Sequence, residues 1–209
     1  MVLAFVLAGL APATGWQEGW PARPAKAAAV FEIDMWPGEG RPDLVAGSAA
    51  LVPRAEPHRD APAAPVLHVE KGQALHFDET LHRTTLAGRL RAREDSHVAG
   101  RRLGPVSRLS RDDYYSDRVP TVSLPVPAGL VIDYLQSGAE GGCLVRVRGE
   151  VIDTDPCPDL VGDPPGFALE SEPRTEWWVR VLIDGRPVGW LLVDGKKVRE
   201  RGRTFAPRP

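Results

Sequence analysis

All five histidines of the chain lie between residues 58 and 97, and they are the side chains best suited to binding a metal. His68 and His76 flank Lys71-Gly72, a turn signal that predicts a β-hairpin with both imidazoles on one polar face. The residues that could join them are His58, Asp60, Asp78 and His82. Imidazole and carboxylate groups are ligands of zinc and similar metals. The cluster from His58 to His97 therefore supports a metal-dependent hydrolase as one hypothesis, with ordinary surface histidines as the other.

A second group of possible ligands is acidic. The stretch DTDPCPDLVGD, residues 153–163, holds its four aspartates within one loop. Carboxylate oxygens bind calcium, but this loop lacks the glycine and the final glutamate of an EF-hand, and a solvated acidic loop is the plainer interpretation. Residues 150–176 are acidic as a whole. An inhibitor or assembly partner that meets a basic target through this loop is a further alternative.

No motif of a known catalytic site occurs in the chain. A Gly-x-Ser-x-Gly elbow, a Walker loop, a dinucleotide fingerprint and a His-Glu-x-x-His pair are all missing from the sequence. The formal net charge is −2, and the arginines between residues 83 and 118 alternate with acids, which argues against a nucleic-acid partner. We therefore expect a protein that is not an enzyme and uses no cofactor.

Three of the six tryptophans stand in WWVRVLIDGRPVGWL, residues 177–191. Asp184-Gly185 between two apolar runs predicts a two-residue hairpin turn, because a type I′ turn needs positive φ at both central positions. In that register Val179 faces Trp190 across the hairpin. The side that faces the core would carry Trp177, Val179, Val181, Val188, Trp190 and Leu192.

The candidate binding residues come from the other side of this hairpin and from one loop. Trp178 and Arg180 point away from the predicted core, and Trp178 could stack on a ligand or pack against the protein. Tyr114 and Tyr115 stand together in the polar stretch 96–118, where they bring apolar area to a surface; packing of the loop is the alternative. One helical turn is expected to begin at Ser110, because acids follow it directly.

The composition indicates which elements must position these residues. Glycine and proline number 21 each and aromatic residues make up 7% of the chain, which favours short strands joined by turns and an all-β fold. We predict an N-terminal β domain over 30–98, a polar connection over 99–118 and a C-terminal β domain over 119–209. A probable signal peptide occupies 1–13, followed by a linker over 14–29.

The two cysteines are interpreted in the light of this export signal. In an oxidising compartment Cys143 and Cys157 can form a disulfide, with two free thiols as the alternative. The stretch CLVRVRGEVIDTDPC predicts a hairpin around Gly149-Glu150, which places Cys143 opposite Pro156 and one residue from Cys157. We therefore expect a disulfide between these two cysteines in a periplasmic or secreted bacterial protein.

The stretch WVRVLIDGRPVGWL, residues 178–191, resembles the final strands of bacterial SH3-like (SH3b) domains. The matching residues are Trp178, Arg180, Val181, Gly189 and Trp190. The stretch ALVPRAEPHRDAPAAPVLHVEKGQAL, residues 50–75, resembles the opening of such a domain through an aliphatic strand, Arg54, Pro57 and Lys71-Gly72. The resemblance implies a small, strongly bent β-barrel without catalytic chemistry. More than 100 residues separate the two stretches, so we expect either one barrel with a large insertion or two in tandem.

Together these observations predict an exported, non-catalytic, SH3-like binding module. Its expected partner is cell-wall glycopeptide or another envelope protein, and its candidate binding residues are Trp178, Arg180, Tyr114 and Tyr115. A metal-dependent cell-wall hydrolase that uses the histidine cluster, and an inhibitor or assembly partner of a secreted protein, are the alternatives. No membrane span is expected after signal cleavage, because no other stretch is long and apolar enough.

Overall fold

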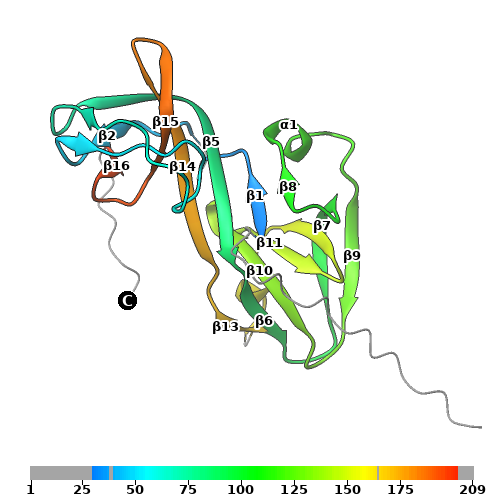
Figure 1. Ribbon diagram of the computed structural model, residues 1–209. Coiled ribbons are helices and arrows are strands. Elements are labelled where there is room, and N and C mark those ends of the chain that lie inside the picture. Colours follow the sequence, from blue (N-terminus) through cyan, green and yellow to red (C-terminus); the bar gives the residue numbers. More distant parts are fainter. Residues whose placement is uncertain (1–29, 38–39, 164, 202–209) are drawn as a thin grey trace, which may run out of the picture.

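The structure is a computed structural model that describes residues 30–37, 40–163 and 165–201 (Figure 1). These residues are mostly β-strand in largely antiparallel sheets, with almost no helix, which confirms the all-β class. No closed barrel is detected within the described part of the chain. The predicted signal peptide and linker lie outside the described residues.

The strands divide between two large sheets and one small pair. The first sheet contains β1 (Phe31–Ile33), β2 (Leu44–Ala46), β5 (Ala74–Leu86), β8 (Arg108–Leu109), β14 (Arg174–Ile183), β15 (Arg186–Leu192) and β16 (Val198–Glu200). The second sheet contains β6 (Gly88–Ala92), β7 (Ser96–Gly104), β9 (Thr121–Val126), β10 (Val131–Ser137), β11 (Cys143–Val147), β12 (Glu150–Thr154) and β13 (Phe167–Ser171). The pair is β3 (Ala50–Leu51) with β4 (Leu67–His68), and the helical turns are α1 (Arg111–Tyr114), η1 (Ala139–Gly141) and η2 (Pro158–Leu160).

The long strand β5 organises the first sheet. It pairs with β14 over most of its length, with β2 at its beginning and with β1 towards its end. Its first half alternates as a half-buried strand should, with Leu75 and Phe77 buried and His76 and Asp78 exposed. The resulting strand order is β16-β2-β5-β14-β15, with β1 and β8 continuing from the far end of β5.

The second sheet is inserted between β5 and β14. The chain leaves the first sheet after Leu86 and returns at Arg174, two residues that pair with each other. Everything between them except β8 and α1 builds the second sheet, in the order β13-β6-β10-β11-β12-β7-β9. In Figure 1 the first sheet lies at the upper left and the second at the lower right.

The predicted division of the chain does not follow this division into sheets. The stretch 99–118, predicted as a polar connection, contains most of β7, all of β8 and α1. Residues 30–98 and residues 119–201 each contribute strands to both sheets. The single helical turn does begin where expected: Ser110 caps α1 by accepting a hydrogen bond from the backbone N–H of Asp113 at 3.1 Å.

Each sheet has its own apolar core, and a third core joins them. The first sheet buries a cluster that includes Phe77, Trp177, Val179, Val181 and Leu191. The second sheet buries one that includes Leu90, Ile132, Val145, Ile152 and Phe167. Between the sheets, Phe31 and Ile33 of β1 pack with Leu135, Leu144 and Val151 of the second sheet. This third core fixes the two sheets against each other.

The tryptophan hairpin turns at Asp184-Gly185 as predicted, with φ values of 49° and 74°. A β-bulge at Val188 of β15, between the pairs Leu182–Pro187 and Val181–Gly189, then shifts the register, so that Val179 faces Leu191 and Arg180 faces Trp190. The predicted pairing of Val179 with Trp190 is therefore wrong. Leu191 takes the buried position, and Trp190 keeps intermediate exposure.

Residues 50–68, here called the arm, explain where Trp190 goes. The arm doubles back on itself through β3 and β4, and its Arg54 exchanges two backbone hydrogen bonds of 2.8 Å with Trp190 at the free edge of β15. Gly189 has φ of 128°, and a Cβ added there would lie 2.8 Å from the carbonyl oxygen of Arg54. The absence of a side chain at Gly189 thus lets the arm approach β15.

Replacing Gly189 by alanine should lower the free energy of unfolding by about 1.5 kcal/mol, because the new Cβ meets backbone and the residue has positive φ. The matched control is Gly185→Ala, which also has positive φ but has no atom within 4 Å of the new Cβ. Chemical denaturation of both variants measures the difference. Equal losses would mean that contact with the arm contributes nothing to the effect of Gly189.

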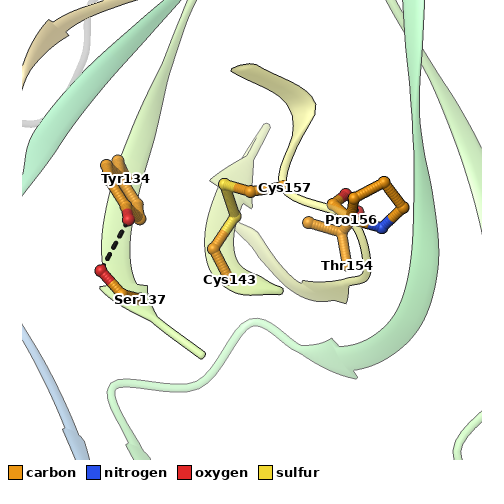
Figure 2. Close-up of a disulfide and its surroundings, with 6 residues drawn as sticks. All are labelled: Tyr134, Ser137, Cys143, Thr154, Pro156 and Cys157. Carbon is orange, nitrogen blue, oxygen red and sulfur yellow. Dashed lines mark hydrogen bonds between the residues drawn. A yellow bond between two sulfur atoms is a disulfide. The ribbon is translucent and has the colours of Figure 1, made fainter. Parts of the chain in front are cut away.

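The predicted disulfide between Cys143 and Cys157 is formed, with Cα atoms 5.2 Å apart (Figure 2). Its hairpin turns at Arg148-Gly149, with φ values of 51° and 85°, and not at Gly149-Glu150 as predicted. Cys143 therefore lies opposite Thr154. Both cysteines are buried in the core of the second sheet, so the bond ties β11 to the segment after β12 from inside.

Candidate functional site

Two of the four candidate binding residues, Tyr114 and Tyr115, line a pocket between the sheets. Its volume is about 270 Å³. Strand β1, the residues after it and β5 supply Ile33, Met35, Trp36, Pro37 and His82. The two tyrosines come from the end of α1. Strands β10, β11 and β12 and the residue after β10 supply Gln136, Ser137, Gly138, Cys143, Leu144 and Asp153. The pocket thus combines aromatic rings with a few polar groups, as ligand sites commonly do.

Tyr114 is held in the wall of this pocket by residues of the second sheet. Its hydroxyl hydrogen-bonds to Asp153, and its backbone carbonyl accepts a hydrogen bond from Arg101. The Arg101 guanidinium also donates to Asp153 at 3.3 Å and lies 5.2 Å from the centre of the Tyr114 ring. Arg101, Asp153 and Tyr114 therefore form one network that anchors α1 to β7 and β12.

Burial changes the ionisation of two groups in this network. Burial raises the pKa of the Asp153 carboxyl, while hydrogen bonds from Tyr114 and Arg101 oppose the change. Burial and the charge of Asp153 both raise the pKa of the Tyr114 hydroxyl. Tyr114 accordingly stays protonated at physiological pH and remains a hydrogen-bond donor to Asp153.

Tyr115 forms the exposed rim of the pocket. It is 58% exposed, and its ring meets the ring of Tyr114 edge to face at 5.1 Å. The guanidinium of Arg111 lies 4.8 Å from the centre of the Trp36 ring and 5.9 Å from that of Tyr115. Arg111 thereby connects aromatic residues that come from opposite sides of the pocket.

The opposite wall contains His82 of β5. Its backbone carbonyl accepts a hydrogen bond of 3.3 Å from the buried Gln136 side chain of β10, which links the two sheets beside the pocket. Desolvation lowers the pKa of His82 to about 4. The imidazole is therefore neutral at pH 7.

Trp178 lies elsewhere and is buried. Only 2% of it is exposed, and its Nε1 donates to Glu176 at 3.0 Å. The arm crosses this face of β5 and β14, where Arg59 pairs with Glu176 and the carbonyl of Pro57 accepts from Arg83. Of the two roles left open for Trp178, stacking on a ligand and packing against the protein, its burial favours packing. Its ring is closed to a ligand while the arm is in place.

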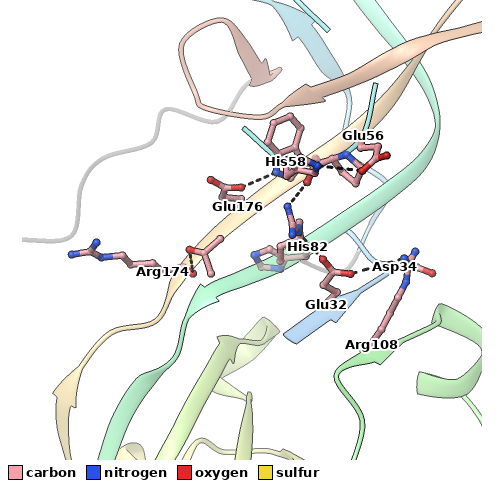
Figure 3. A network of polar contacts seen from close by, with 12 residues as sticks. Glu32, Asp34, Glu56, His58, His82, Arg108, Arg174 and Glu176 are labelled. Atoms are coloured by element: carbon pink, nitrogen blue, oxygen red, sulfur yellow. Dashed lines mark hydrogen bonds and ion pairs between the residues drawn. The ribbon is translucent and has the colours of Figure 1, made fainter. Parts of the chain in front are cut away.

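Figure 3 shows the polar contacts on this face. Glu32 of β1 accepts from Arg83 at 2.7 Å, and Arg108 of β8 pairs with Asp34 at 2.9 Å. His58, which the metal hypothesis invoked, contacts Glu56 in the arm at 3.2 Å. The pair of Glu32 with Arg83 joins β1 to β5, that of Arg108 with Asp34 joins β8 to the end of β1, and that of His58 with Glu56 lies within the arm.

Arg180, the fourth candidate, is engaged on the surface of the first sheet. Its guanidinium donates two hydrogen bonds to Asp78, at 2.9 and 2.7 Å, and lies 2.7 Å from a carboxylate oxygen of Glu79. The hydrogen bond from Arg180 lowers the pKa of Asp78. Arg180 is thus a partner of β5 and does not line the pocket that contains the tyrosines.

The histidines are not brought together. Residues 70–73 turn as expected at Lys71-Gly72, but the flanking strands pair with other partners: β4 with β3, and β5 with β2 and β14. His68 and His76 therefore do not share a hairpin. No group of three or more histidine, cysteine, aspartate or glutamate side chains that could hold a metal is found among the described residues, the acidic loop 153–163 included where it is described.

Of the residues in and beside the pocket, the sequence indicated the two tyrosines as candidate binding residues and His82 as a possible metal ligand, but it did not single out Trp36, Arg111 or Gln136. Trp36 was interpreted only as the end of a strand, and Arg111 as part of a charged loop. The signal that could have singled out Arg111 is its place beside the expected helical turn, one residue after Ser110. Nothing local to Trp36 or Gln136 indicates that they meet.

No family model, no curated protein and no solved structure matches this chain. Within the described residues, no helix is long and apolar enough to cross a membrane.

Proposed function

We propose that the protein is an exported, non-catalytic binding module of the SH3-like type, and that the pocket between its sheets binds cell-wall glycopeptide. The observation that carries this proposal is the pocket of about 270 Å³ lined by Trp36, Tyr114 and Tyr115. Pockets for drug-sized ligands start at about 300 Å³, so this one suits a group of the size of one sugar ring or one amino-acid residue.

The chemistry of the pocket suits a sugar joined to a peptide. The exposed ring of Tyr115 offers an apolar face, while Gln136 and Ser137, which also bond to His82 and Tyr134, bring an amide and a hydroxyl group to the lining. Asp153, the carboxyl group of the lining, is already committed to Arg101 and Tyr114. This arrangement supports binding in preference to catalysis.

The SH3-like part of the proposal is supported by the pairing of the two resembling stretches. Both lie in the first sheet or in its arm, and they meet where Arg54 pairs with Trp190. The second sheet is inserted between β5 and β14, which favours one interrupted unit over two units in tandem. The buried disulfide supports export to an oxidising compartment, where the cell wall lies.

The test is co-sedimentation of the full chain with purified cell-wall sacculi. Tyr115→Ala should weaken binding about tenfold without unfolding the protein, because the ring is exposed and central rim aromatics carry much of the energy of an interface. Val66→Ala, a change at another exposed apolar residue on the arm, is the matched control and should leave binding unchanged.

Each other outcome is informative. If the wild-type protein stays in the supernatant, wall binding is excluded and an envelope protein becomes the partner to seek. If both variants bind like the wild type, the pocket is not the site. Stoichiometric metal in the purified protein would favour the alternative of a metal-dependent hydrolase.

A further inference from the structure

We propose that Arg111 makes the pocket selective for glycopeptides that carry a free carboxylate. This inference rests on the proposed function and names the group of the ligand that the pocket distinguishes. It is argued from three observations: the position of the Arg111 guanidinium, the ion pairs of the neighbouring arginines, and the charge balance of the pocket.

The guanidinium of Arg111 lies beside two aromatic rings of the pocket lining. It is within 4.8 Å of the centre of the Trp36 ring and 5.9 Å of that of Tyr115, and both rings belong to the pocket lining. Stacking uses the flat face of a guanidinium and leaves the N–H groups at its edge free to donate. The two rings therefore hold the cation in place without satisfying its donors.

The neighbouring arginines differ from Arg111 in having carboxylate partners. Arg101 pairs with Asp153, Arg108 with Asp34 and Arg146 with Asp133. Within residues 30–37, 40–163 and 165–201, the side chain of Arg111 forms no ion pair or hydrogen bond. Asp113, two residues away, accepts a hydrogen bond from the Ser110 hydroxyl at 2.6 Å.

The charge balance of the pocket favours an arriving anion. The carboxyl of its lining, Asp153, is compensated by Arg101, and Arg111 is the cation that lies beside the aromatic rings of the lining, with Asp112 and Asp113 following it in the first turn of α1. A carboxylate matches the fork of guanidinium N–H groups and accepts two parallel hydrogen bonds from it. A glycopeptide whose sugar or peptide contacts Tyr115 would bring such a carboxylate to Arg111.

The experiment compares one soluble cell-wall glycopeptide with the same compound after amidation of its carboxylates, by titration calorimetry on the full chain. The wild type should bind the free acid about tenfold more tightly than the amide, since charge-assisted hydrogen bonds are about twice as strong as neutral ones. Arg111→Gln should bind both forms with the affinity that the wild type shows for the amide. Arg111→Lys keeps the charge without the fork and should fall between them.

The matched control is Arg186→Gln, which removes the same charge from an exposed position at the tip of the β14-β15 hairpin. It should preserve the preference for the free acid. If the wild type binds acid and amide equally, the role of Arg111 is overturned and the proposed function stands. If neither form binds to any variant, while the circular dichroism of each variant matches the wild type, the proposed function and this inference both fall.

Discussion

Replacing Cys143 and Cys157 together by alanine is expected to lower the free energy of unfolding by about 3 kcal/mol. The bond closes a loop with a sequence separation of 14 residues, and opening a loop of this size restores roughly that much conformational freedom to the unfolded chain. Both side chains are buried in the core of the second sheet, so their removal also loses packing. Urea denaturation followed by far-ultraviolet circular dichroism measures the change.

Tryptophan fluorescence is the wrong probe for this experiment. The described tryptophans, at positions 36, 177, 178 and 190, lie in the first sheet or pack against its core. A reductant provides the control, because it should shift the wild type towards the double variant and leave the variant unchanged. If the variant unfolds at the same urea concentration as the oxidised wild type, the bond does not stabilise the second sheet.

Acidification should destabilise the protein through His82. Burial lowers its pKa to about 4, whereas the unfolded chain has a histidine pKa of about 6.5. Between these values the unfolded state binds a proton that the native state does not, so the free energy of unfolding falls as the pH falls. The free energy of unfolding is unaffected by this group above about pH 6.5 and falls as the pH approaches 4. Because His82 is only partly enclosed, we expect the loss over this range to be about 2 kcal/mol.

The comparison that isolates His82 uses two variants of β5. His82→Gln should remove this part of the pH dependence between pH 7 and pH 4.5, while His76→Gln, at an exposed position of the same strand, should retain it. Asp153 acts in the opposite direction, because burial raises its pKa and its protonation favours the native state. The quantity to compare is therefore the difference between variants in how the free energy of unfolding depends on pH. Identical pH profiles for His82→Gln and wild type would contradict the prediction.

Features that depend on residues close together in the chain could be predicted from the sequence. The Asp184-Gly185 turn, the cap at Ser110 and the pairing of Cys143 with Cys157 all follow from local signals, and all are present. The predicted turn was wrong by one residue at the Cys143 hairpin, and the predicted register of the tryptophan hairpin was wrong where a distant segment intervenes. The bulge at Val188, next to Gly189, accompanies the approach of the arm, and nothing in residues 177–191 indicates that Arg54 will pair there.

The candidate site shows the same limit. Tyr114 and Tyr115 could be found because two tyrosines in a polar stretch are conspicuous. Trp36 and Gln136 could not be joined to them, because the pocket exists only where β1, α1 and β10 meet. The choice between stacking and packing for Trp178 could not be made from residues 177–191 alone, since the arm meets this face of β14 at Glu176 from a distant part of the chain.

The insertion of the second sheet into the first has a consequence for the order in which the protein folds on the ribosome. The 13 residues of β5 are synthesised long before β14, and every strand of the second sheet emerges between them. The second sheet can therefore assemble first, while the edge of β5 from His76 to Leu86 still lacks β14, its partner strand in the finished protein. In a nascent chain halted before Arg174, β1 and β2 can already pair with β5, but the edge of β5 that faces β14 has no partner strand. This edge is the natural contact for a chaperone or for another unfinished copy.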